Sequence, residues 1–593
     1  MQVASNWRRF RPLLFVSAMF GALLLGAVME AVFAQEATPP AAAAEPAAEP
    51  AAPAAAPTLP DYYDGHATDT NGDGTVDAKD TAKWPDATGA AAGYWTTPST
   101  GPVGDGDPAN LTVPKLYDRI AHNLYSINFV WVLIAGFLVM FMQAGFAMVE
   151  GGLCRAKNSS HTFAMNFMIY PLGCIAFYVY GFGIGWGNWW NGLVPPGWYP
   201  SLGPGLSLLN GGWGIGETAA GVFKYGIIGT KGWCLYGMED VSVLALFFFM
   251  MVFMDTTATI PTGVMAERWA WKNFCLYGLW VALPYCLFAN WVWGGGWLAQ
   301  AGVNWGLGHG AVDFAGSGVV HAMGGAIGLA GGIAIGPRLG KYIDGKPRPL
   351  PPHNIPFAVI GTFILAFGWF GFNPGSTLSG TDLRISAVVV NTMLASVTGA
   401  LATMFYLMGT GKKPDPSMLC NGMLAGLVAI TAPCAFVDSW AACVIGAVAG
   451  VLVVISVNFF DRVGVDDPVG AVSVHGANGL WGLISVGIFA TGKYGAGWNG
   501  VVREAYDANG ASDGMITDGV RGILYGDAGQ LWAQLLDAVV VAVFGFVMAW
   551  VWFKISNVIT PLRVTREVEL QGLDGPEMGV MGYSGFVMDP AAE

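Results

Sequence analysis

The stretch that decides the fold is Asp313-Phe-Ala-Gly-Ser-Gly-Val-Val-His321-Ala-Met-Gly-Gly-Ala-Ile-Gly-Leu329. Its pattern, D-x-x-G-x-x-x-V-H-x-x-x-G-x-x-G-L, occurs again from Asp467 to Leu483. Each copy places a histidine two helical turns after an aspartate, inside a glycine-rich apolar run that is long enough to cross a bilayer. Ionisable residues at membrane depth are costly, so their repetition predicts a conduction path shared by two halves of one fold.

The composition around these copies is that of a polytopic membrane protein. Of the 593 residues, 54% are hydrophobic and only 11% are charged. Residues 126–149 carry no charge at all, and a membrane-spanning helix needs about 20 such residues. Residues 111–560 hold roughly eleven runs of this kind, which predicts an all-α polytopic fold of eleven transmembrane helices. The 85 glycines are typical of membrane helices that approach one another closely.

Charge and cysteine content argue against several other classes. The net charge is −13, but much of the acid lies in the N-terminal segment and the tail, so it indicates no particular binding surface. We expect no nucleic-acid partner, because no basic patch with interleaved aromatic residues is present. The eight cysteines form no C-x-x-C pair and lie mostly in apolar runs, which favours a packing role over a disulfide framework or a metal cluster.

The N-terminal residues resemble a secretory leader. Arg8, Arg9 and Arg11 precede an apolar run, and Val32-Phe33-Ala34 has the form of a cleavage site, so residues 1–34 are predicted to be a signal peptide. The alternative is an uncleaved first helix. Either reading places the following segment outside the membrane. Residues 35–60 form an Ala/Pro-rich linker rather than a folded unit.

A predicted periplasmic segment, residues 61–110, contains a calcium-loop pattern at residues 69–80. The spacing D-x-N-x-D-G resembles an EF-hand or a single dockerin-type repeat, with a glycine at the sharp turn. The alternative is a solvated acidic turn. No other cofactor is expected. The candidate Ca²⁺ ligands are Asp69, Asn71, Asp73, Thr75 and Asp80.

The distribution of lysine and arginine predicts the orientation. Positive residues follow every odd-numbered span, as Arg155 and Lys157 follow the first and Arg268 follows the third, so these ends are assigned to the cytoplasm. The N-terminus is then outside, and residues 561–593 form a cytoplasmic tail. The Asp313 copy runs inward as helix 5, and the Asp467 copy runs outward as helix 10. Helices 1–5 and 6–10 are therefore predicted to be inverted repeats with a substrate site near the midplane.

Longer motifs carry a resemblance to a known family. They are Gln143-Ala-Gly-Phe-Ala-Met-Val-Glu150-Gly-Gly-Leu-Cys-Arg155-Ala-Lys157-Asn158, Gly263-Val-Met-Ala-Glu267-Arg268, Gly368-Trp-Phe-Gly-Phe372-Asn373-Pro-Gly-Ser376, and the two histidine copies. Over residues 115–575 the chain resembles the ammonium transporter (Amt/Mep/Rhesus) family, bacterial Amt type. The resemblance implies ammonium and ammonia as substrates, contact with membrane lipid in the bacterial inner (plasma) membrane, a homotrimer, and no enzymatic activity.

The resemblance also assigns an outer site and a gate. Phe253, Trp293 and Ser376 fall on the family's ammonium recruitment site, while Phe249, Phe253 and Phe372 fall on its phenyl gate. The residue types suit the substrate, because aromatic faces attract a cation and a hydroxyl oxygen accepts a hydrogen bond. Ammonium donates hydrogen bonds and potassium donates none, so such a site can separate two ions of similar size.

Below the gate, His321 and His475 match the family's facing pair of pore-lining histidines. An intact cation in a dry pore has a large desolvation cost. We therefore expect ammonium to lose a proton before it enters the pore. Neutral ammonia can then exchange hydrogen bonds with imidazoles, each of which offers one donor and one acceptor. Whether the proton crosses as well, making transport electrogenic, is left open by the residues.

Three aspartates have open roles at this stage. Asp313, counted with the substrate-binding residues, either contacts or deprotonates ammonium, or caps a helix N-terminus and organises the outer site; we favour the cap. Asp467 is expected to play the pseudo-symmetric part near the cytoplasmic mouth. Asp255, beside Phe253, departs from the small apolar residue expected there, and it either has a local partner or tunes cation capture.

Two other functions are considered. An ammonium sensor would use the same scaffold and signal through its tail to a separate partner. In the tail, Gly572-Leu573-Asp574 matches the family, but Pro576-Glu577-Met578-Gly579 departs from it, so docking of a PII-type signalling protein is only partly supported. A membrane enzyme with a metal at His321, His475 and Asp313 is disfavoured, because no H-x-x-x-H or H-E-x-x-H spacing is present.

Overall fold

The computed structural model describes residues 113–187, 202–217, 223–495, 498–501, 504–506, 512–516 and 519–583. All of them belong to one compact unit that comprises residues 86–195 and 199–593. The predicted signal peptide, the linker and the calcium loop with Asp69, Asn71, Asp73, Thr75 and Asp80 lie outside the described residues.

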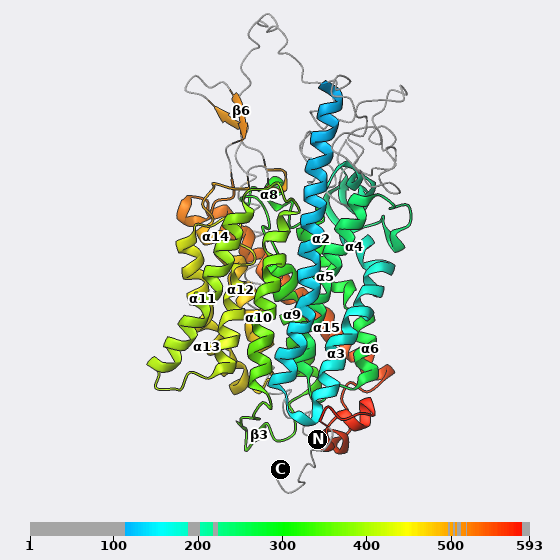
Figure 1. Ribbon diagram of the computed structural model, residues 1–593, viewed down its shortest axis with the longest axis vertical. Helices are drawn as coiled ribbons and strands as arrows, with labels where there is room; N and C mark the ends of the chain where they lie inside the picture. Colours follow the sequence, from blue (N-terminus) through cyan, green and yellow to red (C-terminus); the bar gives the residue numbers. More distant parts are fainter. Residues whose placement is uncertain are drawn as a thin grey trace, which may run out of the picture. The chain divides into compact units, whose positions relative to one another are not determined.

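The described unit is a bundle of long helices (Figure 1). Its longer helices are α2 (Val113–Leu153), α3 (Ser159–Ala176), α5 (Val241–Met265), α6 (Trp271–Trp280), α7 (Ala282–Val292), α9 (Met323–Ile335), α10 (Ile355–Phe372), α11 (Ile385–Gly409), α12 (Pro416–Ile430), α13 (Ser439–Val463), α14 (Asn478–Phe489) and α15 (Ala528–Ile559). Short helices are η3 (Ala156–Asn158), η4 (Phe177–Gly181), α4 (Phe182–Trp186), η5 (Pro204–Leu209), η6 (Trp233–Leu235), α8 (Ala301–Trp305), η7 (Ser317–Ala322), η8 (Pro374–Thr377), η9 (Val472–Ala477), η10 (Trp498–Gly500), η11 (Ile523–Tyr525), α16 (Arg566–Gln571) and η12 (Asp574–Met578).

Strands are confined to three two-stranded antiparallel ribbons in the connections between helices. They pair β1 (Gly212–Glu217) with β2 (Phe223–Gly229), β3 (Tyr342–Ile343) with β4 (Lys346–Pro347), and β5 (Glu504–Tyr506) with β6 (Ser512–Ile516). Within the described residues no strand enters the bundle, so the all-α architecture expected from the composition is confirmed.

The bundle is built to lie in lipid. In the described part of the chain, ten helices or joined helical segments are long and apolar enough to cross a membrane, and α12 is a shorter apolar helix of 15 residues. Large apolar side chains cover the outside of the bundle, as Phe137, Phe363 and Phe405 show with 57%, 64% and 61% of their surface exposed. Such exposure is costly in water and favourable against acyl chains. The chain is therefore a multi-pass membrane protein.

Glycines allow the helices to approach closely where the two histidine copies meet. A Cβ atom added at Gly325, one turn after His321, would collide with the backbone of Gly476, which directly follows His475. A Cβ at Gly479 would lie 2.8 Å from the backbone nitrogen of Ala322. Only small residues permit this backbone-to-backbone contact between membrane helices. The crossing brings η7 and η9, the segments that carry the two histidines, side by side.

At one end of the bundle, a buried ion-pair cluster ties several connections together. Glu267, which is fully buried, accepts a hydrogen bond from Arg155 at 2.6 Å and forms an ion pair with Arg338 at 3.2 Å. Arg338 also pairs with Asp466 at 2.8 Å. Burial raises the pKa of Glu267, but Arg338 and Arg155 outweigh it and hold that pKa below its ordinary value. The cluster therefore consists of ions that neutralise one another away from water.

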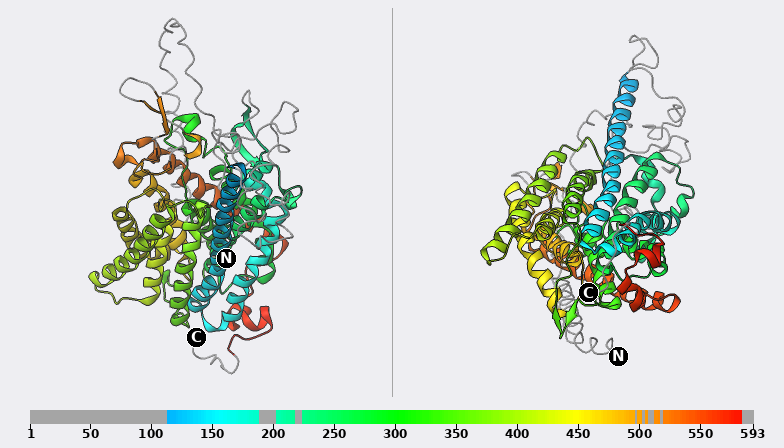
Figure 2. Two further views of the ribbon diagram at one scale, coloured as in Figure 1. Left: turned by 45° about the horizontal axis from the view of Figure 1, so that its top comes forward. Right: turned by 60° about the horizontal axis from the view of Figure 1, so that its bottom comes forward.

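The C-terminal segment folds back on this same end (Figure 2). The Lys157 ammonium donates to the carbonyl of Leu570 at 2.6 Å, and Asp574 accepts the backbone N–H of His161 at 3.0 Å. Glu577 accepts the backbone N–H of Trp271 at 2.8 Å. The start of α3, the start of α6 and the tail thus form one contact region.

Candidate functional site

The two histidine copies fold in the same way at their start. Asp313 accepts four backbone N–H groups, from Gly316 and Ser317 on one oxygen and from Gly318 and Val319 on the other, at 2.8–2.9 Å. Burial raises the pKa of Asp313 to about 6, and these four donors limit the rise. The geometry is that of a helix N-terminal cap on which the orphan amides of the first turn converge.

The inner copy repeats this arrangement with fewer donors. Asp467 accepts the N–H groups of Gly470 at 3.0 Å and Val472 at 2.7 Å. In both copies the helix that follows opens with a widened π-type segment, η7 or η9, and the histidine lies within it. Such segments are rare and occur frequently at functional sites. The sequence repeat is therefore a structural repeat as well.

An aromatic group lies on the outer copy. The ring centroids of Phe253 and Trp293 are 6.1 Å apart with their planes at 70°, and Phe249 lies 4.7 Å from Phe253. The Trp293 indole N–H donates to the carbonyl of Asp313 at 2.7 Å, which fixes the ring beside the capped turn. Three of the sequence-predicted residues are thus in contact, and the Asp313 turn holds Trp293 in place.

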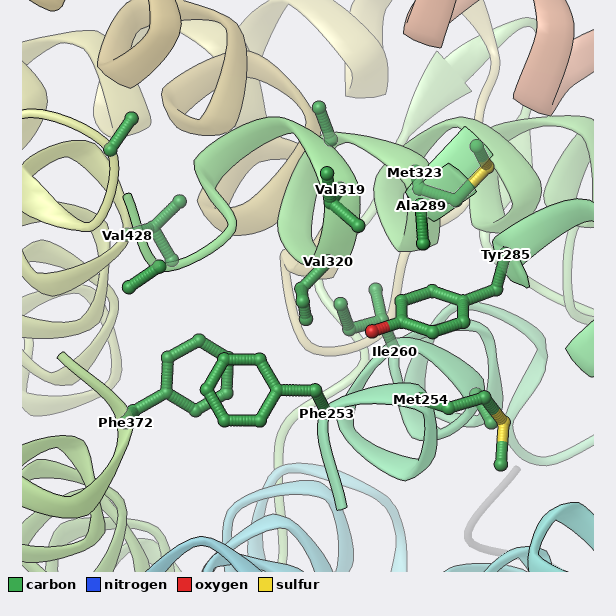
Figure 3. Close-up of a cluster of buried hydrophobic side chains, with 14 of the residues drawn as sticks. Phe253, Met254, Ile260, Tyr285, Ala289, Val319, Val320, Met323, Phe372 and Val428 are labelled. Atoms are coloured by element: carbon green, nitrogen blue, oxygen red, sulfur yellow. The ribbon is translucent and has the colours of Figure 1, made fainter. Parts of the chain in front are cut away.

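The two phenyl rings predicted to form a gate are stacked on each other in this structure. Phe253 from α5 and Phe372 from the end of α10 stack face to face, with centroids 4.0 Å apart and an interplanar angle of 18° (Figure 3). Both rings are fully buried. Because offset stacking of two phenyl rings is favourable by about 0.5–1.5 kcal/mol, a solute must displace them at modest cost.

The two histidines lie directly behind this pair. His321 is 5.3 Å from the Phe372 centroid and 5.2 Å from the His475 centroid, nearly parallel to both rings. The Nδ1 atoms of the two imidazoles are 3.2 Å apart. Trp293, Phe253, Phe372, His321 and His475 therefore form one continuous file of contacting rings.

The Nδ1–Nδ1 contact imposes opposite tautomers on a neutral pair. One ring must carry its proton on Nδ1 to donate, and the other must present a bare Nδ1 to accept. The second ring then carries its proton on Nε2, while the first has a bare Nε2. Within the described residues, the Nε2 atom of the fully buried His321 has no hydrogen-bond partner. An unpaired buried polar atom is costly, and a small hydrogen-bonding solute would satisfy it.

Ser376 is the hydroxyl-bearing residue of the predicted outer site. It lies half-buried one turn after Phe372, and its hydroxyl donates to the Phe372 carbonyl at 2.8 Å. The hydroxyl oxygen keeps its acceptor capacity. The neighbouring Gly375 packs against Phe249, since an added Cβ would lie 3.1 Å from that ring.

Three further residues belong to the site and were not singled out from the sequence. Trp369 stacks on His321 at 5.1 Å, and Phe146 lies 6.0 Å from His475. The buried Tyr285 directs its hydroxyl into the cluster around Phe253 (Figure 3), and that hydroxyl has no partner in the described part of the chain. Trp369 precedes Phe372 by three residues, so helical spacing from a gate residue was a usable signal.

Asp255 faces away from the rings. It follows Phe253 by two residues on α5, which turns it to the opposite side of that helix. Its field acts on Tyr170 and Cys174 of α3, and one of its carboxylate oxygens is unpartnered within the described residues. Among the residues that the structure describes, Asp255 thus has no ion-pair partner and no contact with the aromatic group.

Comparison with known proteins gives this geometry a family. The sequence matches the Ammonium Transporter Family over residues 130–583. Ammonium transporter Amt2 of Archaeoglobus fulgidus is 44% identical over 466 residues, which cover 78% of this chain and 89% of the relative. The chain belongs to the ammonium transporter family. The ammonium transporter of Bacillus subtilis is 32% identical, covering 77% of this chain and 98% of the relative.

Solved structures of this family agree. A structure described as a Sensor Amt Protein aligns with a TM-score of 0.62 and 31% identity, covering 77% of this chain and 99% of that one. Mep2 of Candida albicans aligns with a TM-score of 0.59 and 25% identity, covering 74% and 87%. Membership in the ammonium transporter family confirms the fold class and ammonium transport as the function predicted from the motifs.

Proposed function

We propose that ammonium is captured at the outer aromatic group, loses a proton there, and passes as ammonia between His321 and His475. The observation that carries this proposal is the continuous file from Trp293 through Phe253 and Phe372 to the two imidazoles. The rings supply a cation-attracting face outside and a neutral hydrogen-bonding surface inside.

Energetics favour deprotonation over passage of the ion. Transfer of an isolated cation into a dry, apolar medium costs on the order of tens of kcal/mol by Born solvation. A π-face returns only about 0.5–2 kcal/mol of this. Phe253, Phe372 and His321 are each at most 1% exposed, so water does not accompany the solute through the gate. Neutral ammonia avoids the charge term and replaces water with imidazole nitrogens.

Asp313 serves this function through the backbone in our proposal. All four of its hydrogen bonds come from the turn that leads into η7. Its carboxylate orients that turn, fixes Trp293 through the Asp313 carbonyl and adds negative potential at the capture site. Ser376 contributes its free acceptor lone pair to the outer vestibule.

We extend the proposal to the surroundings of the protein. The positive residues after odd-numbered spans support an outer N-terminus and a cytoplasmic tail in a bacterial inner membrane. The exposed apolar faces support lipid contact or assembly as a homotrimer. The docked tail offers a surface for a PII-type protein, and the 69–80 pattern supports a Ca²⁺ site through Asp69, Asn71, Asp73, Thr75 and Asp80.

The direct test is transport by the full-length protein in liposomes. An ammonium gradient should produce internal pH changes above those of empty liposomes, and simultaneous current recording shows whether charge moves with the substrate. A current in proportion to ammonium flux means that the proton crosses too, whereas flux without current means that it stays outside. No flux above empty liposomes would refute conduction.

The alternative is an ammonium sensor. One similar solved structure is described as a Sensor Amt Protein, and the tail of this chain is docked on the ends of α3 and α6. A pure sensor would bind ammonium without flux in the same liposomes, so the one measurement separates the two functions.

A further inference from the structure

A second carboxylate lies at the inner end of the histidine pair. Phe146 of α2 packs against His475, and Glu150 follows Phe146 by one helical turn on the same face of that helix. The side chain of Glu150 is 3% exposed. It therefore lies one turn beyond the ring that contacts His475, toward the end of α2 at which Arg155 joins the buried ion-pair cluster.

Glu150 sits against the inner copy of the repeat. A Cβ atom added at Gly263 would lie 2.6 Å from the Val469 side chain and 3.1 Å from the Glu150 carboxyl carbon. The missing side chain of Gly263 thus lets the carboxylate approach the turn capped by Asp467, whose charge acts on Glu150. The thiol of Cys154, on the same helix end, is the other titratable group within its field.

All side-chain hydrogen bonds to this carboxylate come from neutral groups. The Asn166 amide donates to it at 2.7 Å, and the Thr262 hydroxyl lies 2.9 and 3.0 Å from its two oxygens. Behind them, Thr259 donates to Asn166 at 2.9 Å, and Gln143 donates to Thr259 at 3.0 Å. Three helices, α2, α3 and α5, thus converge on one acid at membrane depth.

Glu150 and Glu267 are both buried carboxyl groups, but among the described residues only Glu267 is paired with arginine. Glu267 is as deeply buried but is neutralised by Arg155 and Arg338. No arginine or lysine in the described residues pairs with Glu150. A carboxyl group held only by neutral donors can exist in both protonation states, which is the requirement for a group that exchanges protons.

We propose that Glu150 is the proton-exchanging group at the inner end of the pore, which turns ammonia back into ammonium. On entry into the cell, the nitrogen lone pair takes the proton of the Glu150 carboxyl, giving ammonium and a carboxylate. The carboxylate then regains a proton from cytoplasmic water. On exit, the same carboxylate removes a proton from ammonium before ammonia passes His475. This assignment rests on the proposed conduction of neutral ammonia.

The mechanism explains the donors around the acid. Asn166 and Thr262 hold the carboxylate in place while it is ionised, and the ammonium that forms beside it is attracted by both Glu150 and Asp467. Their combined negative charge draws the product away from the dry pore toward the cytoplasm. Without Glu150, ammonia must leave the pore unprotonated and meet its proton only in bulk water.

The test compares the shape of the pH dependence of flux between the parent and a Glu150 variant, and not the magnitude of the flux alone. Full-length protein and its Glu150→Gln variant are reconstituted, and flux at fixed total ammonium is measured over a range of pH that is equal on both sides. For ammonium offered at the inner face, flux through the parent should level off once Glu150 is ionised, because the exit step uses the carboxylate as its base. In E150Q, flux should keep rising in proportion to free ammonia and fall below the parent by about a hundredfold near neutral pH.

Asp255→Asn is the matched control. It removes a second buried carboxylate, which lies on the same face of α5 as Thr262 but two turns away and outside the hydrogen bonds to Glu150, and its pH profile should follow that of the parent. Glu150→Asp, which keeps the acid, should restore the levelling even if its rate is lower. Profiles of the same shape for parent and E150Q overturn the proposal, as does loss of flux in both E150Q and E150D. A parent that carries no ammonia refutes conduction itself, a separate outcome.

Discussion

The two copies of the histidine repeat share a motif but are anchored by opposite chemistry. Before Asp313, the backbone of Val312 is held by the neutral amide of Gln534, which donates to its carbonyl and accepts its N–H at 2.8 Å each. Before Asp467, the carboxylate of Asp466 accepts two hydrogen bonds from the Arg338 guanidinium at 2.8 and 2.9 Å and a third from the Arg338 backbone N–H at 2.8 Å. The residue before the capping aspartate is thus held by a neutral amide in the outer copy and by an ion pair in the inner copy.

The comparison shows which residues must be the same in both copies and which can differ between them. Both copies retain the capping aspartate, the π-type turn and the histidine, because these place the two imidazoles against each other. The residues just before each aspartate lie outside that constraint. In the proposed orientation, a neutral amide suits the outer end, where an added cation would repel ammonium, and arginines suit the cytoplasmic end, to which the tail also binds.

The largest effect should follow from removing the shared element of the two copies. Replacing His321 and His475 together by alanine deletes the hydrogen-bonding surface that the two imidazoles form behind the phenyl pair. Ammonia flux should then fall to the level of empty liposomes, or water should fill the space and let bare cations leak. Parallel measurements of ammonium flux and potassium current decide between these outcomes. A double variant with the flux and selectivity of the parent contradicts the role of the pair.

The two aspartates should differ in their importance. In Asp313→Asn, an amide N–H₂ faces donors that a carboxylate had satisfied, and four backbone amides compete for one carbonyl oxygen. Leaving one buried donor unpaired costs about 1–3 kcal/mol, so the outer turn should lose its conformation and transport should be abolished. Asp467→Asn affects two donors and should leave measurable flux. Equal losses in the two variants would remove the asymmetry argued here.

Sequence reasoning reached the fold and most of the site because the repeat and the motifs are local patterns. The all-α bundle, the stacking of Phe253 on Phe372 and the contact between His321 and His475 were all expected from spacing and resemblance. Trp369, Phe146 and Glu150 were not assigned roles, because each acts through a neighbour on another helix. Gln534 is the same case, since it lies 222 positions from the turn it clamps.

The free energy of unfolding should fall more when the ion pair at Arg338 is removed than when the amide of Gln534 is removed. Arg338→Ala removes the cation that Glu267 and Asp466 share, so Asp466 loses its salt bridge and Glu267 keeps only Arg155, which should cost about 3–5 kcal/mol. Gln534→Ala leaves only neutral groups of Val312 unpaired and should cost about 1–3 kcal/mol. Thermal unfolding in detergent compares the two variants. A larger loss for the glutamine variant would contradict this order.

The ion pair between Arg338 and Asp466 should also make the inner end sensitive to acid. Burial alone raises the pKa of Asp466, but Arg338 and Arg268 overcome it and hold that pKa well below the ordinary value. A depressed folded-state pKa contributes stability above the unfolded-state pKa and loses it as pH falls through the folded-state pKa. The parent should therefore lose more thermal stability in acid than Arg338→Ala does. Equal acid sensitivity of the two proteins would show that the pair carries no such linkage.

The smallest effect should come from the aromatic residues that attach to the outer copy alone. Phe253 and Trp293 each offer a ring worth about 0.5–2 kcal/mol to a cation, so Phe253→Ala with Trp293→Ala should reduce discrimination of ammonium against potassium by roughly tenfold. Flux of ammonia itself should persist, because the histidine pair is intact. Competition between the two ions in liposomes measures the change. Since the inner copy has no such rings in contact with its capped turn among the described residues, the loss should appear for ammonium offered from the outer face, and unchanged selectivity there would exclude the aromatic group as the discriminating site.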